Sequence, residues 1–327
     1  MPTNSRFGAA SISKPDFDPD PDRMLNRVPF GLVRTHKSWT PRPPQTILKP
    51  MRYRRLKDYW WGLRGGRLQK VSLHAGFTCP NRDGTLGHGG CVYCSNEAFT
   101  PAYCHEARSL DEQITAGLAF MKARYPRARG FLGYLQAYTG SHARFEDLIA
   151  LYEGLLEHPG LCGLVIGTRP DCLPDPLLEW LARARNRRPV YLEIGIESFS
   201  DDTLHRMKRG HTAAQAEDAV HRAASHGIPV GGHFLIGFPG EDWKAFFREV
   251  ERFNALPLHS VKLHQLQVFR DTPLATYYRN HPEAFTFPGK TEYLEAVAAW
   301  LARIRPEIHI DRIAGEAPPR HILNPSW

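Results

Sequence analysis

The chain reads Gly76-Phe77-Thr78-Cys79-Pro80-Asn81-Arg82-Asp83-Gly84-Thr85-Leu86-Gly87-His88-Gly89-Gly90-Cys91-Val92-Tyr93-Cys94 near the end of its first third. This stretch, called the cysteine loop below, holds three of the six cysteines. Its glycine, proline, asparagine and aspartate content indicates a loop. A loop can bring Cys79, Cys91 and Cys94 to one point, which a single helix or strand cannot do. Three thiolates suit a zinc ion or an iron–sulfur cluster.

The number of ligands separates these two metal centres. A structural zinc site is closed by four ligands, usually in two Cys or His pairs. Candidates for the fourth are His74, His88, Cys104 and His105, and neither His74 nor His105 forms a second Cys or His pair at ligand spacing. An iron–sulfur cluster with three protein thiolates leaves one iron open to a small molecule. The spacing therefore favours a cluster, with zinc as the alternative and buried structural thiols as a third interpretation.

Composition restricts the class of protein. The chain has 327 residues, of which 42% are hydrophobic, enough for a sizeable core. Six cysteines without regular spacing do not indicate a disulfide framework, so we expect a reducing, cytoplasmic location. No apolar run approaches the ~20 residues that a bilayer-spanning helix needs, so no membrane association is expected. The formal net charge of +8 permits an anionic partner such as RNA.

Short apolar segments alternate with amphipathic segments along most of the chain. The predicted strands are residues 71–73, 130–136, 161–167, 190–196, 230–236 and 260–268. The predicted helices are residues 109–125, 144–157, 175–185, 201–208, 212–225, 242–256, 274–279 and 290–303, followed by a short strand at 308–313. Capping boxes open two of these helices, Ser109-x-x-Glu112 and Thr212-x-x-Gln215.

Alternating strands and helices predict an α/β fold with a parallel sheet and right-handed crossovers. Six units are too few to close an eight-unit barrel, so we expect a partial (β/α)6 TIM-type barrel with its site at the carboxyl ends of the strands. Residues 1–50 are predicted to be a disordered extension, 51–272 the core, and 273–327 C-terminal helices and a cap across the barrel mouth. The aromatic and basic segment 53–68 is expected to pack against the barrel end, with nucleic-acid binding as the alternative.

A Cys-x11-Cys-x2-Cys loop after the first strand, with Tyr93 between the last two cysteines, resembles the radical S-adenosylmethionine (SAM) superfamily. It is similar to the branch that includes the YhcC-like proteins and the Elongator catalytic subunit. The resemblance extends in order along residues 76–84, 134–139, 167–172, 192–198, 209–211, 237–241, 262–264 and 323–327.

The resemblance implies an enzyme in which Cys79, Cys91 and Cys94 hold a 4Fe-4S cluster and SAM chelates the open iron. Reductive cleavage of SAM would give a 5′-deoxyadenosyl radical that acts on an unidentified substrate. An external electron donor of the flavodoxin or ferredoxin type is implied as a partner. RNA is a candidate substrate, from the Elongator kinship and the basic charge. The alternative function is a zinc-binding nucleic-acid module.

The resemblance also implies SAM-binding residues, each at or near the end of a strand or in a following loop. No catalytic residue is assigned. The implied cofactor contacts are Tyr93 with the adenine, Gln136 with the methionine amino group, Glu197 and Ser198 with the ribose, Arg209 with the methionine carboxylate, and Gly237, Gly240 and Gln267 around the adenine. Glu197 departs from the family pattern, where the usual residue resembles Gln. A bidentate guanidinium fork at Arg209 would suit a carboxylate.

Overall fold

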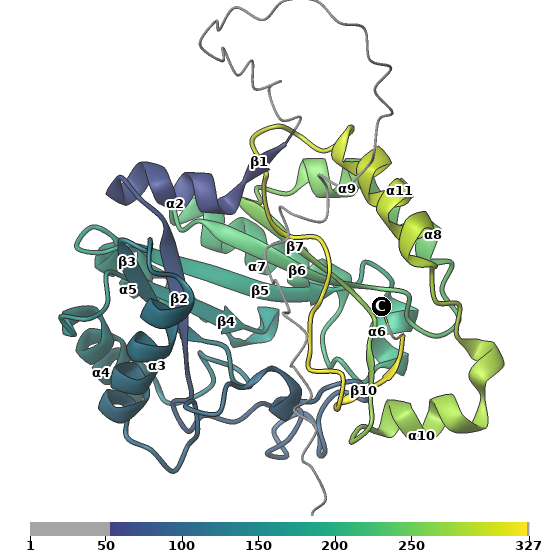
Figure 1. The fold of residues 1–327 in the computed structure, drawn as a ribbon, viewed down its shortest axis with the longest axis horizontal. Helices are drawn as coiled ribbons and strands as arrows, with labels where there is room; N and C mark the ends of the chain where they lie inside the picture. Colours follow the sequence, from purple (N-terminus) through teal and green to yellow (C-terminus); the bar gives the residue numbers. More distant parts are fainter. Residues whose placement is uncertain (1–52, 326) are drawn as a thin grey trace, which may run out of the picture. The chain divides into compact units, whose positions relative to one another are not determined.

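The computed structural model describes residues 53–325 and residue 327, so the predicted extension 1–50 lies outside the described residues. The described part is built on one eight-stranded sheet with the order β1-β9-β7-β6-β5-β4-β3-β2 (Figure 1). Every neighbouring pair in this sheet is parallel. Its strands are β1 Arg54–Arg55, β2 Leu68–Leu73, β3 Gly130–Leu135, β4 Leu164–Thr168, β5 Val190–Glu197, β6 Val230–Ile236, β7 Ser260–Gln265 and β9 His309–Arg312.

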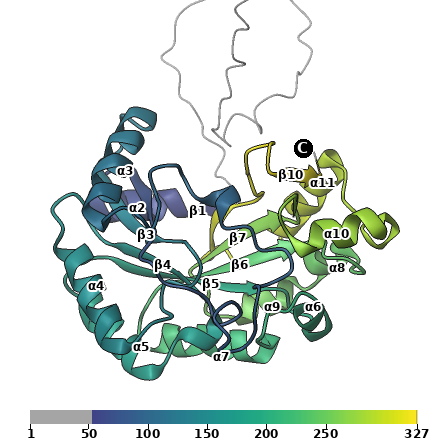
Figure 2. The same ribbon diagram turned by 90° about the horizontal axis from the view of Figure 1, so that it is seen from below.

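Helices connect these strands and cover the outer face of the sheet. Figure 2 shows the strands in a curved row, with α4, α5 and α7 along its outer side. The helices are α2 Leu56–Arg64, α3 Leu110–Arg124, α4 Phe145–Glu157, α5 Asp175–Arg185, α6 Asp201–Arg206, α7 Ala213–Ser225, α8 Trp243–Arg248, α9 Val250–Ala255, α10 Pro273–Asn280 and α11 Lys290–Leu301. The predicted partial barrel is confirmed, and the curvature places the strand ends around a common space.

Local sequence signals explain where several helices begin. Both predicted capping boxes are present: Ser109 with Glu112 opens α3, and Thr212 with Gln215 opens α7. The single helix predicted over 242–256 is wrong, because the chain breaks at Glu249 into α8 and α9. Glu249 has φ −79° and ψ 23°, and its N–H donates to the carbonyl of Phe246 three residues back, which ends the first helix with a tight turn.

The sheet extends beyond the six predicted strands. The short strand predicted at 308–313 is β9, which pairs with β7, and β1 pairs with β9. The strand predicted over 260–268 is interrupted, because β7 ends at Gln265 and a separate β8 spans Val268–Phe269. β8 pairs with the C-terminal β10 Ile322–Asn324, which brings the chain's last segment back to the carboxyl end of β7. The domain division at 272 stays a prediction.

The segment before β2 packs onto the barrel end, as the packing interpretation predicted. Trp60 of α2 is buried and its ring lies edge-on to Tyr191 of β5, with ring centroids 5.2 Å apart. Tyr59 lies 4.2 Å from the His259 ring in a similar edge contact. Throughout the described ranges, no helix is both long and apolar enough to cross a membrane.

Candidate active site at the carboxyl ends of the strands

A cavity of about 220 Å³ lies at the carboxyl ends of the strands, where the partial barrel predicts a site. It gathers most of the residues singled out from the sequence. Those that line it are Cys91, Cys94, Tyr93, Gln136, Glu197, Arg209 and Gln267. Those that do not are Cys79, Ser198, Gly237 and Gly240.

The three loop cysteines are free thiols in partly or fully buried positions. Burial raises the pKa of Cys94 and the neighbouring Cys91 raises it further, while Arg82 opposes both effects. Among residues 53–325 and 327, no three His, Cys, Asp or Glu side chains are grouped to hold a single metal ion. The three loop cysteines supply thiolates, the ligands that hold iron–sulfur clusters, so the chemistry of this set fits such a cluster.

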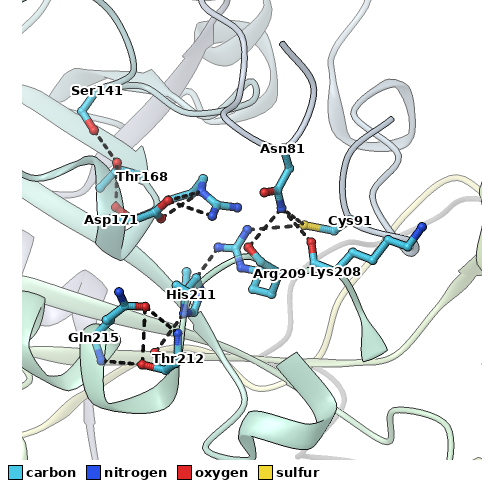
Figure 3. Close-up of polar contacts among 12 residues, drawn as sticks. Asn81, Cys91, Ser141, Thr168, Asp171, Lys208, Arg209, His211, Thr212 and Gln215 are labelled. Atoms are coloured by element: carbon cyan, nitrogen blue, oxygen red, sulfur yellow. Dashed lines mark hydrogen bonds and ion pairs between the residues drawn. The ribbon is translucent and has the colours of Figure 1, made fainter. Parts of the chain in front are cut away.

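Asn81 fastens the cysteine loop to the turn between α6 and α7 (Figure 3). Its Nδ2 donates to the carbonyls of Lys208 at 2.7 Å and Arg209 at 3.0 Å, and lies 3.3 Å from Cys91 Sγ. The turn needs glycine at 210, where φ is +76° and a Cβ would lie 2.7 Å from Asn81 Oδ1. The sequence alone gives Asn81 no role, although it lies two residues after Cys79.

Glu197 ends β5 in a conformation that non-glycine residues rarely adopt. Its φ is +69°, and the pairing of β5 with β6 shifts register at this point, as in a β-bulge. The bulge turns the carboxylate toward two bases: Oε2 lies 2.9 Å from His233 Nδ1 and Oε1 lies 3.4 Å from Arg209 Nη2. Burial alone would raise the pKa of Glu197, but His233 and Arg209 lower it to about 2, so the carboxylate stays charged.

Arg209 lies between this carboxylate and the cysteine loop. Nη2 donates to the Gly195 carbonyl at 2.8 Å, and Nη1 lies 3.8 Å from Cys91 Sγ. Burial opposes the charge, but Tyr93, Glu197 and Cys91 raise the pKa of Arg209 well above its usual value. Its buried Nε has no hydrogen-bond partner within the described part of the chain. A buried N–H without an acceptor is energetically costly. A free N–H of this kind is expected where an acidic ligand binds and supplies the acceptor.

Two further contacts concern the predicted Tyr93 and Gln136. The Tyr93 ring lies 5.4 Å from the Phe238 ring, and its buried hydroxyl is unpaired among the residues described. Gln136 Oε1 accepts a bond from Ser72 Oγ at 3.4 Å. Both side chains therefore reach the cavity with polar groups available.

The remaining predicted SAM contacts lie outside the cavity lining. Ser198 Oγ donates to Glu241 Oε1 at 3.2 Å, beside the cavity lining rather than in it. Gly237 and Gly240 follow β6 with φ of +92° and +75°, which explains glycine at both positions but places neither against the cavity.

A buried group of charges on the inner face of the sheet was not predicted. Glu193 of β5 accepts bonds from Tyr134 at 2.6 Å, from Lys262 at 3.1 Å and from Lys70. Lys70 also lies 3.0 Å from Asp311. Burial disfavours the ionised form, but Lys262 and Lys70 lower the pKa of Glu193. These residues come from five strands, so only the curvature of the sheet brings them together.

Residues 79–252 match the family described as the Radical SAM superfamily, and residues 258–327 match a Radical_SAM C-terminal domain. Protein YhcC of Escherichia coli (strain K12) is 33% identical, over 80% of this chain and 83% of its own length. The uncharacterised protein YtqA of Bacillus subtilis (strain 168) is 30% identical, over 93% of this chain and 89% of its own.

Two other similarities are more limited. A tRNA-2-methylthio-N(6)-dimethylallyladenosine synthase of Acidithiobacillus ferrooxidans is 30% identical, over 54% of this chain and 42% of that enzyme. The solved structure of an archaeal Methanocaldococcus infernus Elp3, lacking its N-terminus, superposes with a TM-score of 0.55 at 16% identity. It covers 79% of this chain and 59% of that one, and supports the fold alone.

Proposed function

Because the chain belongs to the radical SAM superfamily, we propose that it cleaves SAM reductively at a 4Fe-4S cluster held by Cys79, Cys91 and Cys94. The supporting observation is that Cys91, Cys94 and the incompletely bonded Arg209 line one cavity. When bound, the cluster and SAM supply an electron and a 5′-deoxyadenosyl radical that abstracts a hydrogen atom from the substrate. An acidic flavodoxin- or ferredoxin-type protein is the proposed electron donor, in a cytoplasmic setting.

The chain's own residues would bind and orient SAM. The Arg209 Nε–H is available to a carboxylate oxygen, and the guanidinium charge suits the methionine carboxylate. Glu197, held ionised, can accept a hydrogen bond from the ribose hydroxyls, and Tyr93 can contact the adenine from the cysteine loop. Gln136 and Gln267 also line the cavity and offer amide groups to SAM.

The release of 5′-deoxyadenosine tests this proposal. Protein reconstituted anaerobically with iron and sulfide, then given SAM and a strong reductant, should release 5′-deoxyadenosine measurable by mass spectrometry. The Cys91→Ala variant should release none, whereas Cys162→Ala, outside the cysteine loop, should match the unaltered protein. Iron and sulfide uptake without any SAM cleavage would contradict the proposal.

We propose further that the substrate is an RNA. The named activity of the similar tRNA-modifying enzyme and the net charge of +8 support this class. Nucleosides from the total RNA of a strain lacking the protein should differ in one modification from those of the parent strain, and the gene should restore it. Identical nucleoside profiles would contradict an RNA substrate. The zinc-module alternative instead predicts one zinc per chain with no iron or sulfide.

A further inference from the structure

The cavity lining includes two polar side chains from β7, Lys262 and His264. Residues two apart on a strand face the same side, and both line the cavity. Their exposed fractions are only 8% and 7%. Neither has a role in the proposed binding of SAM. Two buried nitrogen bases side by side require an explanation, because burying such groups is costly unless they are paired.

Lys262 is fixed in place with one donor left over. Its Nζ donates to Tyr134 Oη and to Glu193 Oε2, both at 3.1 Å. An ammonium group has three donors, so a third N–H is available to a molecule in the cavity. Glu193 is shared between Lys262 and Lys70, and Asp311 also pairs with Lys70, so Lys262 presents a charged N–H donor within a balanced group of charges.

His264 presents an unmet nitrogen in a positive environment. Its Nε2 is buried without a partner in the ranges the structure describes, and its ring lies edge-on to His233 with centroids 4.6 Å apart. The other side of the ring faces Gly315, where a Cβ would lie 2.7 Å from Nδ1. Burial, followed by the charges of His233, Arg312 and Lys262, lowers the pKa of His264 well below its usual value, so the ring is neutral.

We infer that Lys262 Nζ and His264 Nε2 together bind an anionic oxygen group of the substrate, a carboxylate or a phosphate. The lysine supplies charge and the neutral imidazole supplies a directed N–H, the pair of contacts that such a group accepts. The inference rests on the proposed function only in taking this cavity as the active site. Anchoring one end of the substrate at β7 would hold a C–H bond of the same molecule toward the cysteine loop.

The C-terminal segment keeps His264 in position. Gln265 Oε1 accepts from the Gly315 N–H at 2.7 Å, and its Nε2 donates to the Gly315 carbonyl at 3.1 Å. This pair holds residue 315 against the imidazole. A Gly315→Ala change should therefore displace the ring without removing any charge from the cavity.

The test is direct binding of inorganic phosphate and of acetate to the cluster-loaded protein. Nuclear magnetic resonance of 15N-labelled histidines follows the His264 signal, identified by its loss in His264→Phe. Each anion should shift this signal in a saturable way, and the tighter of the two identifies the source. Lys262→Met and Gly315→Ala should each weaken binding by about tenfold or more, while Lys262→Arg retains more of it. Lys290→Met, an exposed residue on α11, is the matched control.

The inference is overturned if neither anion shifts the His264 signal, or if Lys290→Met weakens binding as much as Lys262→Met. Should Lys262→Met fail to fold, Lys262→Arg and Gly315→Ala still decide the result. Anion binding is read without SAM cleavage. Absence of 5′-deoxyadenosine from the unaltered protein would therefore count against the proposed function and leave this inference standing.

Discussion

The Arg209 guanidinium lies 3.4 Å from the Glu197 carboxylate, and both side chains are buried at the end of β5. Two further groups hold the pair in place. His233 contacts the Glu197 carboxylate, and the Gly195 carbonyl accepts a hydrogen bond from the Arg209 guanidinium. Removing one member of a buried ion pair leaves the other uncompensated, which usually costs more than the pair contributes. Conservative changes are therefore the informative ones here.

Arg209→Lys should weaken SAM binding by about 10- to 100-fold, because lysine keeps the charge but loses the planar fork. Equilibrium dialysis of SAM against the cluster-loaded protein measures this. Arg279→Lys, an exposed residue on α10, is the control and should bind SAM as the unaltered protein does. If the Arg209→Lys variant and the control bind SAM with equal affinity, Arg209 does not contact SAM.

Gly195→Ala should reduce SAM binding while leaving the iron content unchanged. A Cβ at this position would lie 2.6 Å from Glu197 Oε1, and closer still to Arg209 Nη2, so the pair has to move. Gly154→Ala is the matched control, because nothing lies within 4 Å of a Cβ there and α4 should gain up to about 1 kcal/mol. SAM affinity is measured as above and iron by colorimetric analysis. An unchanged affinity would show that the pair can shift without consequence.

Asn81→Ala should lower the free energy of unfolding by about 1–3 kcal/mol, because the Lys208 and Arg209 carbonyls lose a buried donor. The cysteine loop should also lose iron faster in the presence of a chelator. Urea unfolding and the decay of visible absorbance measure the two effects. Asn280→Ala, exposed at the end of α10, should leave both unchanged. A chelator rate equal to that of the unaltered protein would argue against this contact.

Stability should fall as the pH decreases from about 6.5 toward 4, with His259 as one cause. Burial and the charge of the stacked His309 lower the pKa of His259 to about 4. Between the folded pKa and the unfolded pKa, the unfolded chain binds a proton that the folded protein does not, so acid favours unfolding. Above the unfolded pKa neither state binds this proton, and no stability is lost. His259→Phe should flatten the fall in melting temperature between pH 7 and pH 5. The exposed His221→Phe should not.

The order of strands and helices could be predicted because it is local. Apolar runs of five to eight residues and two capping boxes are properties of neighbouring residues. The breaks at Glu249 and after Gln265 were missed, since both depend on how the chain packs rather than on the pattern of its residues. The two-residue strand β1 is defined by its pairing with β9, which is far away in the sequence.

The same distinction applies to the site. The cysteine trio is encoded in one loop, and Arg209 and Glu197 were found through family resemblance. Lys70, Glu193 and Lys262 are widely separated and lie in strands, where a charged residue alternating with apolar ones reads as solvent-facing. His264 lies in the same alternating pattern in β7, and the resemblance over residues 262–264 gave it no role. Glu193 and His233 lie in strands that are otherwise largely apolar, and that pattern is the signal that would have identified these two residues.

The central claim is that three thiolates hold a cluster whose remaining iron takes SAM. Electron paramagnetic resonance of the dithionite-reduced, reconstituted protein, recorded with and without SAM, tests it most directly. We predict about four irons and four sulfides per chain, a reduced 4Fe-4S signal, and a change in that signal on adding SAM that Cys79→Ala abolishes. A signal that SAM leaves unchanged, or one tightly held zinc in place of iron, would contradict the account.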